Sequence, residues 1–189
     1  MDIGIISLKG SESMKIIAVS AVTAGGKTTA VNAVKEKLPR CTSLHFDDYS
    51  FEGEVDDFHQ WVLDGTDYNV WNLSPLKADI ENIISSGEYD YLLLDYPFAY
   101  AHRMIRQYLD CCIFLDTPLD IAMARRVLRD MQAASGDEIR QDMETYLQYA
   151  RPAYVHMREE QLAAADYVLD GAKAPETLVQ EAMEIILHC

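Results

Sequence analysis

Residues 16–29 read IIAVSAVTAGGKTT, and this stretch decides the fold class. Its first five residues, Ile16–Ser20, are mostly apolar and β-branched, which predicts a buried strand. Thr28–Leu38 then carries apolar residues at helical spacing, and Pro39 ends the predicted helix. A glycine-rich loop between such a strand and such a helix places successive backbone N–H groups at a helix N-terminus, where they attract anions. The stretch therefore predicts a phosphate-binding loop in an α/β fold.

The loop matches the end of the P-loop pattern, in which Gly and four residues precede Gly-Lys-Ser/Thr. Here the match is Gly26-Lys27-Thr28, and Ala21 stands at the position of the first glycine. In this motif the lysine neutralises the β- and γ-phosphates and the hydroxyl ligates Mg²⁺. The predicted nucleotide-binding residues of the loop are Thr23, Ala24, Gly25, Gly26, Lys27, Thr28 and Thr29. The alternative is a glycine-rich turn that binds nothing.

The rest of the chain alternates in the same way between strands and helices. Further strands are predicted at 43–46, 91–94, 111–115 and 165–169, and further helices at 74–86, after 118, at 137–149 and 153–165, and from 175 onward. This alternation, together with the phosphate loop, predicts a P-loop NTPase-type three-layer sandwich, with a five-stranded parallel sheet and helices on both faces, to which the resemblance described below adds a short helical lid. We expect one domain over residues 14–189, preceded by an N-terminal extension, 1–13, of undecided role.

Composition excludes several classes of protein. The 189 residues hold 16 Lys and Arg against 31 Asp and Glu, a net charge of −15, which disfavours nucleic-acid and anionic-membrane partners. The sequence has no apolar run long enough to span a membrane and no signal-peptide pattern at its start. Four cysteines lack metal-ligand spacing and are interpreted as reduced thiols. We therefore expect a cytoplasmic protein with a small-molecule partner, and make no prediction of its oligomeric state.

Carboxylates follow two of the predicted strands. Asp47 and Asp48 come directly after the second strand, and Asp95 follows the apolar run Leu92–Leu94, as in a Walker B strand that holds Mg²⁺. The carboxyl ends of parallel strands form the ligand-binding edge of such a sheet. A kinase acting on an alcohol needs a carboxylate there to accept the hydroxyl proton. The alternatives are an acidic turn at 47–48 and a turn-capping role for Asp95.

Residues 41–76 contain no Lys or Arg, but eight acidic residues interleaved with aromatic ones. The aromatic residues are Tyr49, Phe51, Phe58, Trp61, Tyr68 and Trp71. An acceptor that already carries a phosphate needs cations to hold it, so this segment favours a neutral or cationic acceptor with a planar part. The alternative is a solvated edge whose aromatic residues pack into the core.

The chain resembles the nicotinamide riboside kinases and, more broadly, the uridine kinase and phosphoribulokinase group of P-loop kinases. The resemblance spans residues 14–187 and is carried by Met14–Thr29, Leu38–Cys41, Phe46–Tyr49, Tyr68–Val70, Asp95, Ala124–Asp130, Tyr146-Leu147, Arg151-Pro152 and Ala165–Gly171. It implies an ATP- and Mg²⁺-dependent transfer of a phosphoryl group to a hydroxyl, most simply the 5′-hydroxyl of a nucleoside of the uridine, cytidine or nicotinamide riboside type.

The same resemblance assigns site residues. It makes Asp47 the base and a metal ligand beside Thr28 and Asp95, within an acceptor segment at about 47–72. The implied acceptor contacts are Asp48, Tyr49, Tyr68 and Asn69. The family has an Asp where this chain has Asn69, and Glu-Gly where it has Asp95-Tyr96.

The resemblance also implies a lid, at about 125–140, whose arginines clamp the transferring phosphoryl group. Arg125 and Arg129 lie four residues apart on one helix face, and Arg126 is predicted to contact the nucleotide. With Lys27 and Asp47, Arg125 and Arg129 complete the predicted catalytic set. The alternative for these arginines is salt bridging to nearby acidic residues.

Three other functions fit parts of the pattern. The first is the same reaction on another alcohol, such as a vitamin precursor or a sugar. The second is a nucleotide-binding regulator with weak activity, suggested by Ala21, Tyr96 and Asn69. The third is a P-loop GTPase, which the missing Asn-Lys-x-Asp segment disfavours.

Overall fold

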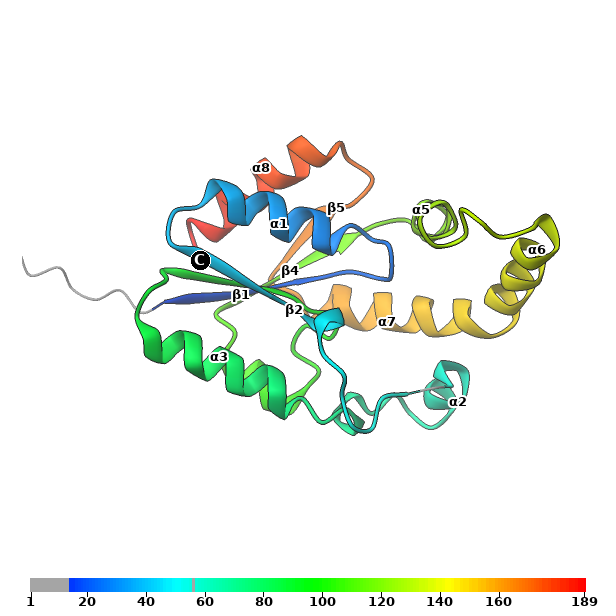
Figure 1. The fold of residues 1–189 in the computed structure, drawn as a ribbon, viewed down its shortest axis with the longest axis horizontal. Helices are drawn as coiled ribbons and strands as arrows, with labels where there is room; N and C mark the ends of the chain where they lie inside the picture. The colour runs from blue at the N-terminus through cyan, green and yellow to red at the C-terminus, as the bar shows by residue number, and fades with distance from the viewer. Residues whose placement is uncertain (1–13, 56) are drawn as a thin grey trace, which may run out of the picture.

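A computed structural model describes residues 14–55 and 57–189, so the predicted extension 1–13 lies outside the described residues (Figure 1). The chain forms a five-stranded sheet in the order β2-β3-β1-β4-β5, and every pair of neighbours is parallel. The strands are β1 (Lys15–Ser20), β2 (Cys41–His45), β3 (Tyr91–Asp95), β4 (Cys111–Asp116) and β5 (Tyr167–Asp170). The predicted α/β class and five-stranded parallel sheet are confirmed.

Helices cover both faces of this sheet, which gives three layers (Figure 1). One face packs against α1 (Lys27–Lys37) and α8 (Pro175–Ile186), and the other against α3 (Ser74–Ser86), α4 (Arg103–Arg106) and α7 (Arg151–Ala164). Alternation along β1 sends Ile17 to the first face and Ile16 to the second. The central strands are apolar because both of their faces are buried.

Two helices, α5 (Leu119–Asp130) and α6 (Gly136–Thr145), lie beyond the carboxyl ends of the strands, on the right of Figure 1, and contain most of the predicted lid at about 125–140. The helix α6 begins with a capping box between Ser135 and Glu138. Where the sequence predicts two separate helices, α6 continues into α7 through a π-helical turn, η3 (Tyr146–Ala150). Lid and core are therefore joined by one continuous helical path.

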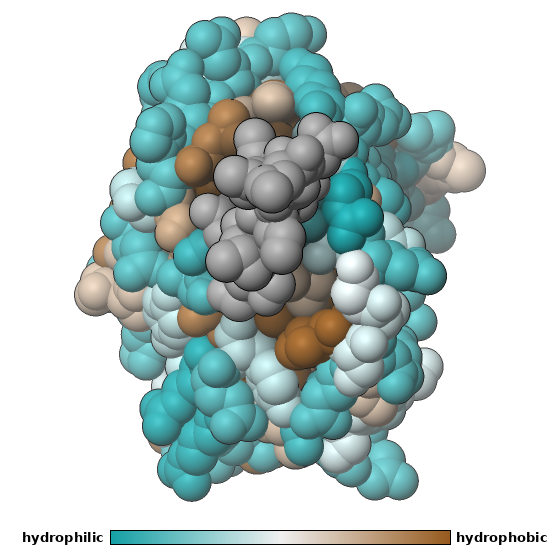
Figure 2. Space-filling view, turned by 90° about the vertical axis from the view of Figure 1, so that its left-hand side faces the viewer, coloured by the Kyte–Doolittle hydropathy of each residue, from teal (hydrophilic) through white to brown (hydrophobic). Residues whose placement is uncertain are grey.

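The acceptor segment holds short elements that the sequence analysis did not predict. After β2 come η1 (Phe46–Asp48), α2 (Phe58–Leu63) and η2 (Tyr68–Val70), and α2 packs against α7. None of the helices in the described residues is long and apolar enough to cross a membrane. The end of the molecule opposite the lid has a mostly hydrophilic surface with small apolar patches (Figure 2).

Candidate active site

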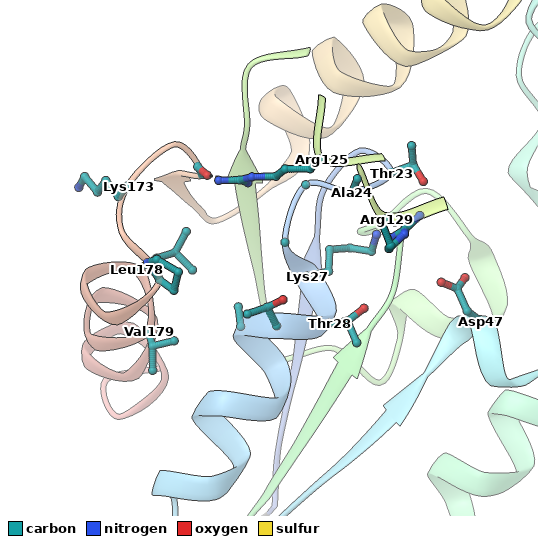
Figure 3. Close-up of a pocket in the computed structure, with 16 residues that line it drawn as sticks. Thr23, Ala24, Lys27, Thr28, Asp47, Arg125, Arg129, Lys173, Leu178 and Val179 are labelled. Atoms are coloured by element: carbon teal, nitrogen blue, oxygen red, sulfur yellow. Dashed lines mark hydrogen bonds between the residues drawn. The ribbon is translucent and has the colours of Figure 1, made fainter. Parts of the chain in front are cut away.

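One cavity of about 390 Å³ lies at the carboxyl edge of the sheet (Figure 3). Residues from the phosphate loop, the start of α1, η1, α5, the loop after β5 and α8 line it. They are Thr23, Ala24, Gly25, Gly26, Lys27, Thr28, Thr29, Ala30, Asp47, Arg125, Arg129, Gly171, Lys173, Pro175, Leu178 and Val179. The fold thus brings the whole predicted loop together with Asp47 and two of the three lid arginines.

The phosphate loop depends on glycine at two positions. Gly26 precedes α1 with a φ of 100°, a left-handed conformation that favours glycine. A Cβ at position 25 would lie 2.7 Å from the Cβ of Ala21 and 2.8 Å from the Val22 carbonyl oxygen, too close for either. Because Gly25 lacks a Cβ, the buried Ala21 fits in place of the usual first glycine. The Gly25 N–H donates to the Val22 carbonyl at 3.0 Å and closes the turn.

Lys27 reaches across the cavity toward Arg129, and Asp47 faces both from the end of β2 (Figure 3). Burial lowers the pKa of Lys27, while the nearby Asp95 and Asp47 carboxylates raise it in part. Two cations and a carboxylate therefore face one space, where an anionic ligand would compensate the cations.

Asp95 is not among the residues that line the cavity, but it contacts Thr28, which is. The Thr28 hydroxyl donates to Oδ2 of the buried Asp95 at 2.5 Å. His45 Nδ1 lies 3.2 Å from the same oxygen, and His45 Nε2 lies 3.1 Å from Ser43 Oγ. A chain of hydrogen bonds thus leads from the edge of the sheet to the predicted metal ligand. The sequence alone assigns His45 no role, because its position beside Asp95 depends on how β2 lies in the sheet.

The oxygen atoms of Thr28, Asp47 and Asp95 suit a Mg²⁺ ion that is held partly by substrate phosphates. Thr28, Asp47 and Asp95 supply a hydroxyl and carboxylates, the hard ligands that Mg²⁺ prefers. Within residues 14–55 and 57–189, no group of three or more His, Cys, Asp or Glu side chains forms a metal cage. Mg²⁺ in kinases is held by one or two carboxylates together with substrate phosphates, so these residues fit an ion that arrives with a nucleotide.

The three lid arginines have different surroundings. Arg125 Nη1 donates to the Gly171 carbonyl at 3.2 Å, across the top of the cavity (Figure 3). Arg129 lines the cavity and binds Asp130 through two hydrogen bonds of 2.6 and 2.9 Å. Arg126, which the sequence assigns to the nucleotide, is not among the lining residues, because it faces α6 and pairs with Asp142.

The four predicted acceptor contacts lie outside the lining of this cavity. Asp48 is exposed at the end of η1, and the Tyr49 hydroxyl donates to Asp79 at 2.7 Å. Tyr68 is buried, and its hydroxyl donates to Glu160 of α7 at 2.6 Å. Asn69 accepts a hydrogen bond of 2.9 Å from the backbone N–H of Arg103 and donates to Asp67. Hydrogen bonds within the protein thus hold three of the four side chains.

Aromatic residues of the acceptor segment form a cluster of their own in the core. Phe51, Trp61, Tyr68 and Trp71 are buried, so for these four the packing alternative is confirmed. The Trp71 and Phe98 ring centroids lie 4.9 Å apart, and those of Trp61 and Tyr68 likewise 4.9 Å. These buried rings therefore stabilise the fold.

The opposite end of the cavity is formed by residues that were not predicted from the sequence. Gly171, Lys173, Pro175, Leu178 and Val179, from the loop after β5 and from α8, line it there. Lys173 pairs with Glu181 at 2.5 Å, which leaves an apolar wall beside the loop. Because the carboxyl ends of parallel strands meet at one edge of the sheet, the position of this loop directly after the last strand could have predicted that it lies at the cavity.

The chain is similar to known kinases in sequence and fold. The model of the phosphoribulokinase / uridine kinase family matches residues 88–178. The chain is 30% identical over 190 residues to nicotinamide riboside kinase 2 of Mus musculus, covering 90% of this chain and 94% of that protein. It is 25% identical over 178 residues to the uridine kinase of Borrelia turicatae, covering 82% and 86%. A solved deoxyadenosine kinase from M. mycoides shares the fold, with a TM-score of 0.52, 15% identity and coverage of 92% and 100%.

Proposed function

The chain belongs to the phosphoribulokinase / uridine kinase family and is a kinase, and we propose that it transfers the γ-phosphoryl group of ATP to the 5′-hydroxyl of an unphosphorylated nucleoside. One observation carries this proposal: Lys27, Arg129 and Asp47 face a single cavity. Two cations suit the transferring phosphoryl group, and the carboxylate beside them suits an acceptor hydroxyl.

The donor would lie along the cavity from the loop after β5 to Asp47. The apolar wall of Leu178 and Val179 suits a base, while the phosphate loop and Lys27 suit a triphosphate. Thr28 and Asp95, with Asp47, would hold Mg²⁺, which when bound would neutralise phosphate charge.

Asp47 is the proposed base. It accepts the proton of the acceptor hydroxyl, the oxygen forms a bond to the γ-phosphorus, and the bond between that phosphorus and the departing ADP oxygen breaks. Lys27, Arg125 and Arg129 are the proposed cations that stabilise charge on the phosphoryl group and on ADP. Catalysis by this chain then rests on positioning and on charge.

The acceptor is proposed to be a nucleoside for two reasons. The segment after Asp47 carries no Lys or Arg up to residue 76, which suits an acceptor without a phosphate. The relatives are named for uridine and nicotinamide riboside, which are both nucleosides. The proposed acceptor contacts are Asp48, Tyr49, Tyr68 and Asn69. Three of these side chains, Tyr49, Tyr68 and Asn69, already make hydrogen bonds within the protein. These bonds would either orient the side chains toward the acceptor or be replaced by bonds to it.

We also propose that the protein works in the cytoplasm on its small-molecule substrates. Its four cysteines are free thiols, which suits a reducing compartment. Burial raises the pKa of the Cys41 thiol to about 11, so this thiol is weakly reactive at neutral pH.

ADP release from ATP and Mg²⁺ tests the proposal, with uridine, cytidine, nicotinamide riboside, ribose and pantothenate as acceptors. We expect turnover with at least one nucleoside, and a loss of at least about a hundredfold in Asp47→Asn. Asp90→Asn is the matched control, because Asp90 pairs with Arg40 before the amino end of β3. Turnover with ribose or pantothenate alone would replace the nucleoside by another alcohol. ATP binding without turnover on any acceptor would favour a regulator.

A further inference from the structure

Thr117 lies between the end of β4 and the start of α5, where a threonine ordinarily caps a helix. Here it does not, since Pro118 is the N-cap and no side-chain capping bond forms. Its hydroxyl donates instead to the carbonyl of Gly25 in the phosphate loop, at 2.8 Å. Thr117 is 1% exposed, so this bond is shielded from water.

Gly171, after β5, makes room for this bond. A Cβ at position 171 would lie 1.9 Å from the Thr117 hydroxyl oxygen, well inside contact distance. The Gly171 N–H donates to the Asp116 carbonyl at 3.2 Å, and its carbonyl accepts from Arg125. The loops after β4 and β5 are therefore packed around the hydroxyl that reaches Gly25.

The Gly25 carbonyl matters because it belongs to the same peptide group as the N–H of Gly26. In a planar trans peptide these two bonds point in opposite directions. Fixing the carbonyl toward the buried Thr117 turns the Gly26 N–H to the other side, and Gly26 lines the cavity. Ala21 lies close to the same glycine, since a Cβ at position 25 would be 2.7 Å from that of Ala21.

We propose that Thr117 is a positioning residue of the phosphate loop, which orients the Gly25–Gly26 peptide so that its N–H faces the nucleotide phosphates. The proposal rests on the proposed function, because it requires a nucleotide in this cavity. It also explains why position 171 is glycine in this chain. Without the hydroxyl, the Gly25 carbonyl loses a buried partner and the peptide is free to rotate.

Calorimetric titration with ADP tests this role, using the full chain as wild type, Thr117→Val and Thr117→Ser. Valine keeps the volume of threonine without the hydroxyl, and serine keeps the hydroxyl. We expect valine to weaken ADP binding about tenfold, as for a lost buried hydrogen bond, and serine to stay within about twofold of wild type. Ser85→Ala is the control, because it removes a hydroxyl that donates at 2.7 Å to the carbonyl of Glu81 at an exposed site on α3.

The melting temperature without ligand separates positioning from folding. Equal ADP affinity in wild type and Thr117→Val overturns the proposal, as does equal weakening by valine and serine. Should Thr117→Val fail to fold, Gly171→Ala, which displaces the hydroxyl without removing it, must weaken ADP binding for the proposal to stand. Absence of ADP binding to the wild type would instead contradict the proposed function.

Discussion

The donor half and the acceptor half of this kinase differ in what their polar side chains already bind. In the donor half, Lys27 and Arg129 line a cavity in which Asp47 is the neighbouring carboxylate. In the acceptor half, Tyr68 binds Glu160 and Asn69 binds the backbone of Arg103. In the first half, charged groups line a cavity, although Arg129 also binds Asp130, whereas in the second half Tyr68 and Asn69 bind other parts of the protein away from that cavity.

This difference shows two ways of building a site. The phosphate loop is a local structure, so its short motif determines most of its geometry. The acceptor segment is held by contacts with distant elements, including α7 and the residues after β3. We therefore expect substitutions in the donor half to change catalysis and nucleotide binding, and those in the acceptor half to change stability together with acceptor affinity.

Two neighbouring arginines give the largest expected contrast. Arg129 lines the cavity, whereas Arg126 pairs with Asp142 outside it. Arg129→Ala should lower kcat about a hundredfold, as loss of one charge-stabilising donor does. Arg126→Ala should leave kcat within about threefold and lower the melting temperature, since it breaks a half-buried pair. Steady-state kinetics and thermal melts of both variants measure this, and equal losses of kcat would contradict the assignment.

The packing of Ala21 against Gly25 predicts a smaller but specific effect within the donor half. Gly25→Ala places a Cβ 2.7 Å from that of Ala21 and 2.8 Å from the Val22 carbonyl, so the loop must shift. We expect ADP affinity to fall about tenfold, in keeping with the usual cost of overpacking. Adding Ala21→Gly should restore part of the loss, because it removes one of the two clashes. A double-mutant cycle on ADP affinity tests this, and strictly additive effects would argue against it.

In the acceptor half, Tyr68→Phe removes the hydroxyl that binds Glu160. We expect a loss of about 1 kcal/mol in the free energy of unfolding, a few-fold higher KM for the acceptor and an unchanged KM for ATP. Tyr108→Phe is the matched control, since Tyr108 also donates to a glutamate, Glu81, at 2.6 Å. A rise in the acceptor KM in both variants, or a rise in the KM for ATP with Tyr68→Phe, would remove the distinction between the halves.

The smallest effect concerns pH. Burial lowers the pKa of His102, although the Trp71 carbonyl and Asp67 raise it in part. Below the ordinary histidine value of about 6.5 the unfolded chain takes up the proton first, so this residue makes stability fall as pH falls. The His102 ring accepts from the N–H of Met104 and donates to Trp71, as a neutral imidazole does. Melting temperature between pH 7 and 5 should fall less in His102→Asn than in wild type. Parallel pH profiles would show that His102 does not contribute.

The sequence predicts the sheet and the phosphate loop because both rest on local patterns. The predicted last strand, 165–169, lies slightly early, since Asp166 instead accepts from the N–H of Cys112 and the strand begins at Tyr167. The short helix α2 was missed because six residues give too little periodicity to recognise.

The site residues also differ in whether a local sequence pattern is enough to predict them. Lys27 and Asp47 follow from their places after β1 and β2, whereas Arg126 and Arg129 cannot be told apart by spacing alone. Only the position of α6 shows which of them faces the cavity. The wall formed by Leu178 and Val179 likewise depends on how α8 lies beside α1.

The π-helical turn η3 determines how far α6 is rotated about its axis relative to α7. A π-turn holds one residue more than an α-turn, and each residue rotates an α-helix by about 100°. Deleting one residue from 146–150 would therefore turn α6 by about that angle relative to α7. Asp142 would leave Arg126, and α6 would present a different side to α5. A single residue of chain length thus sets the angle at which α6 faces α5.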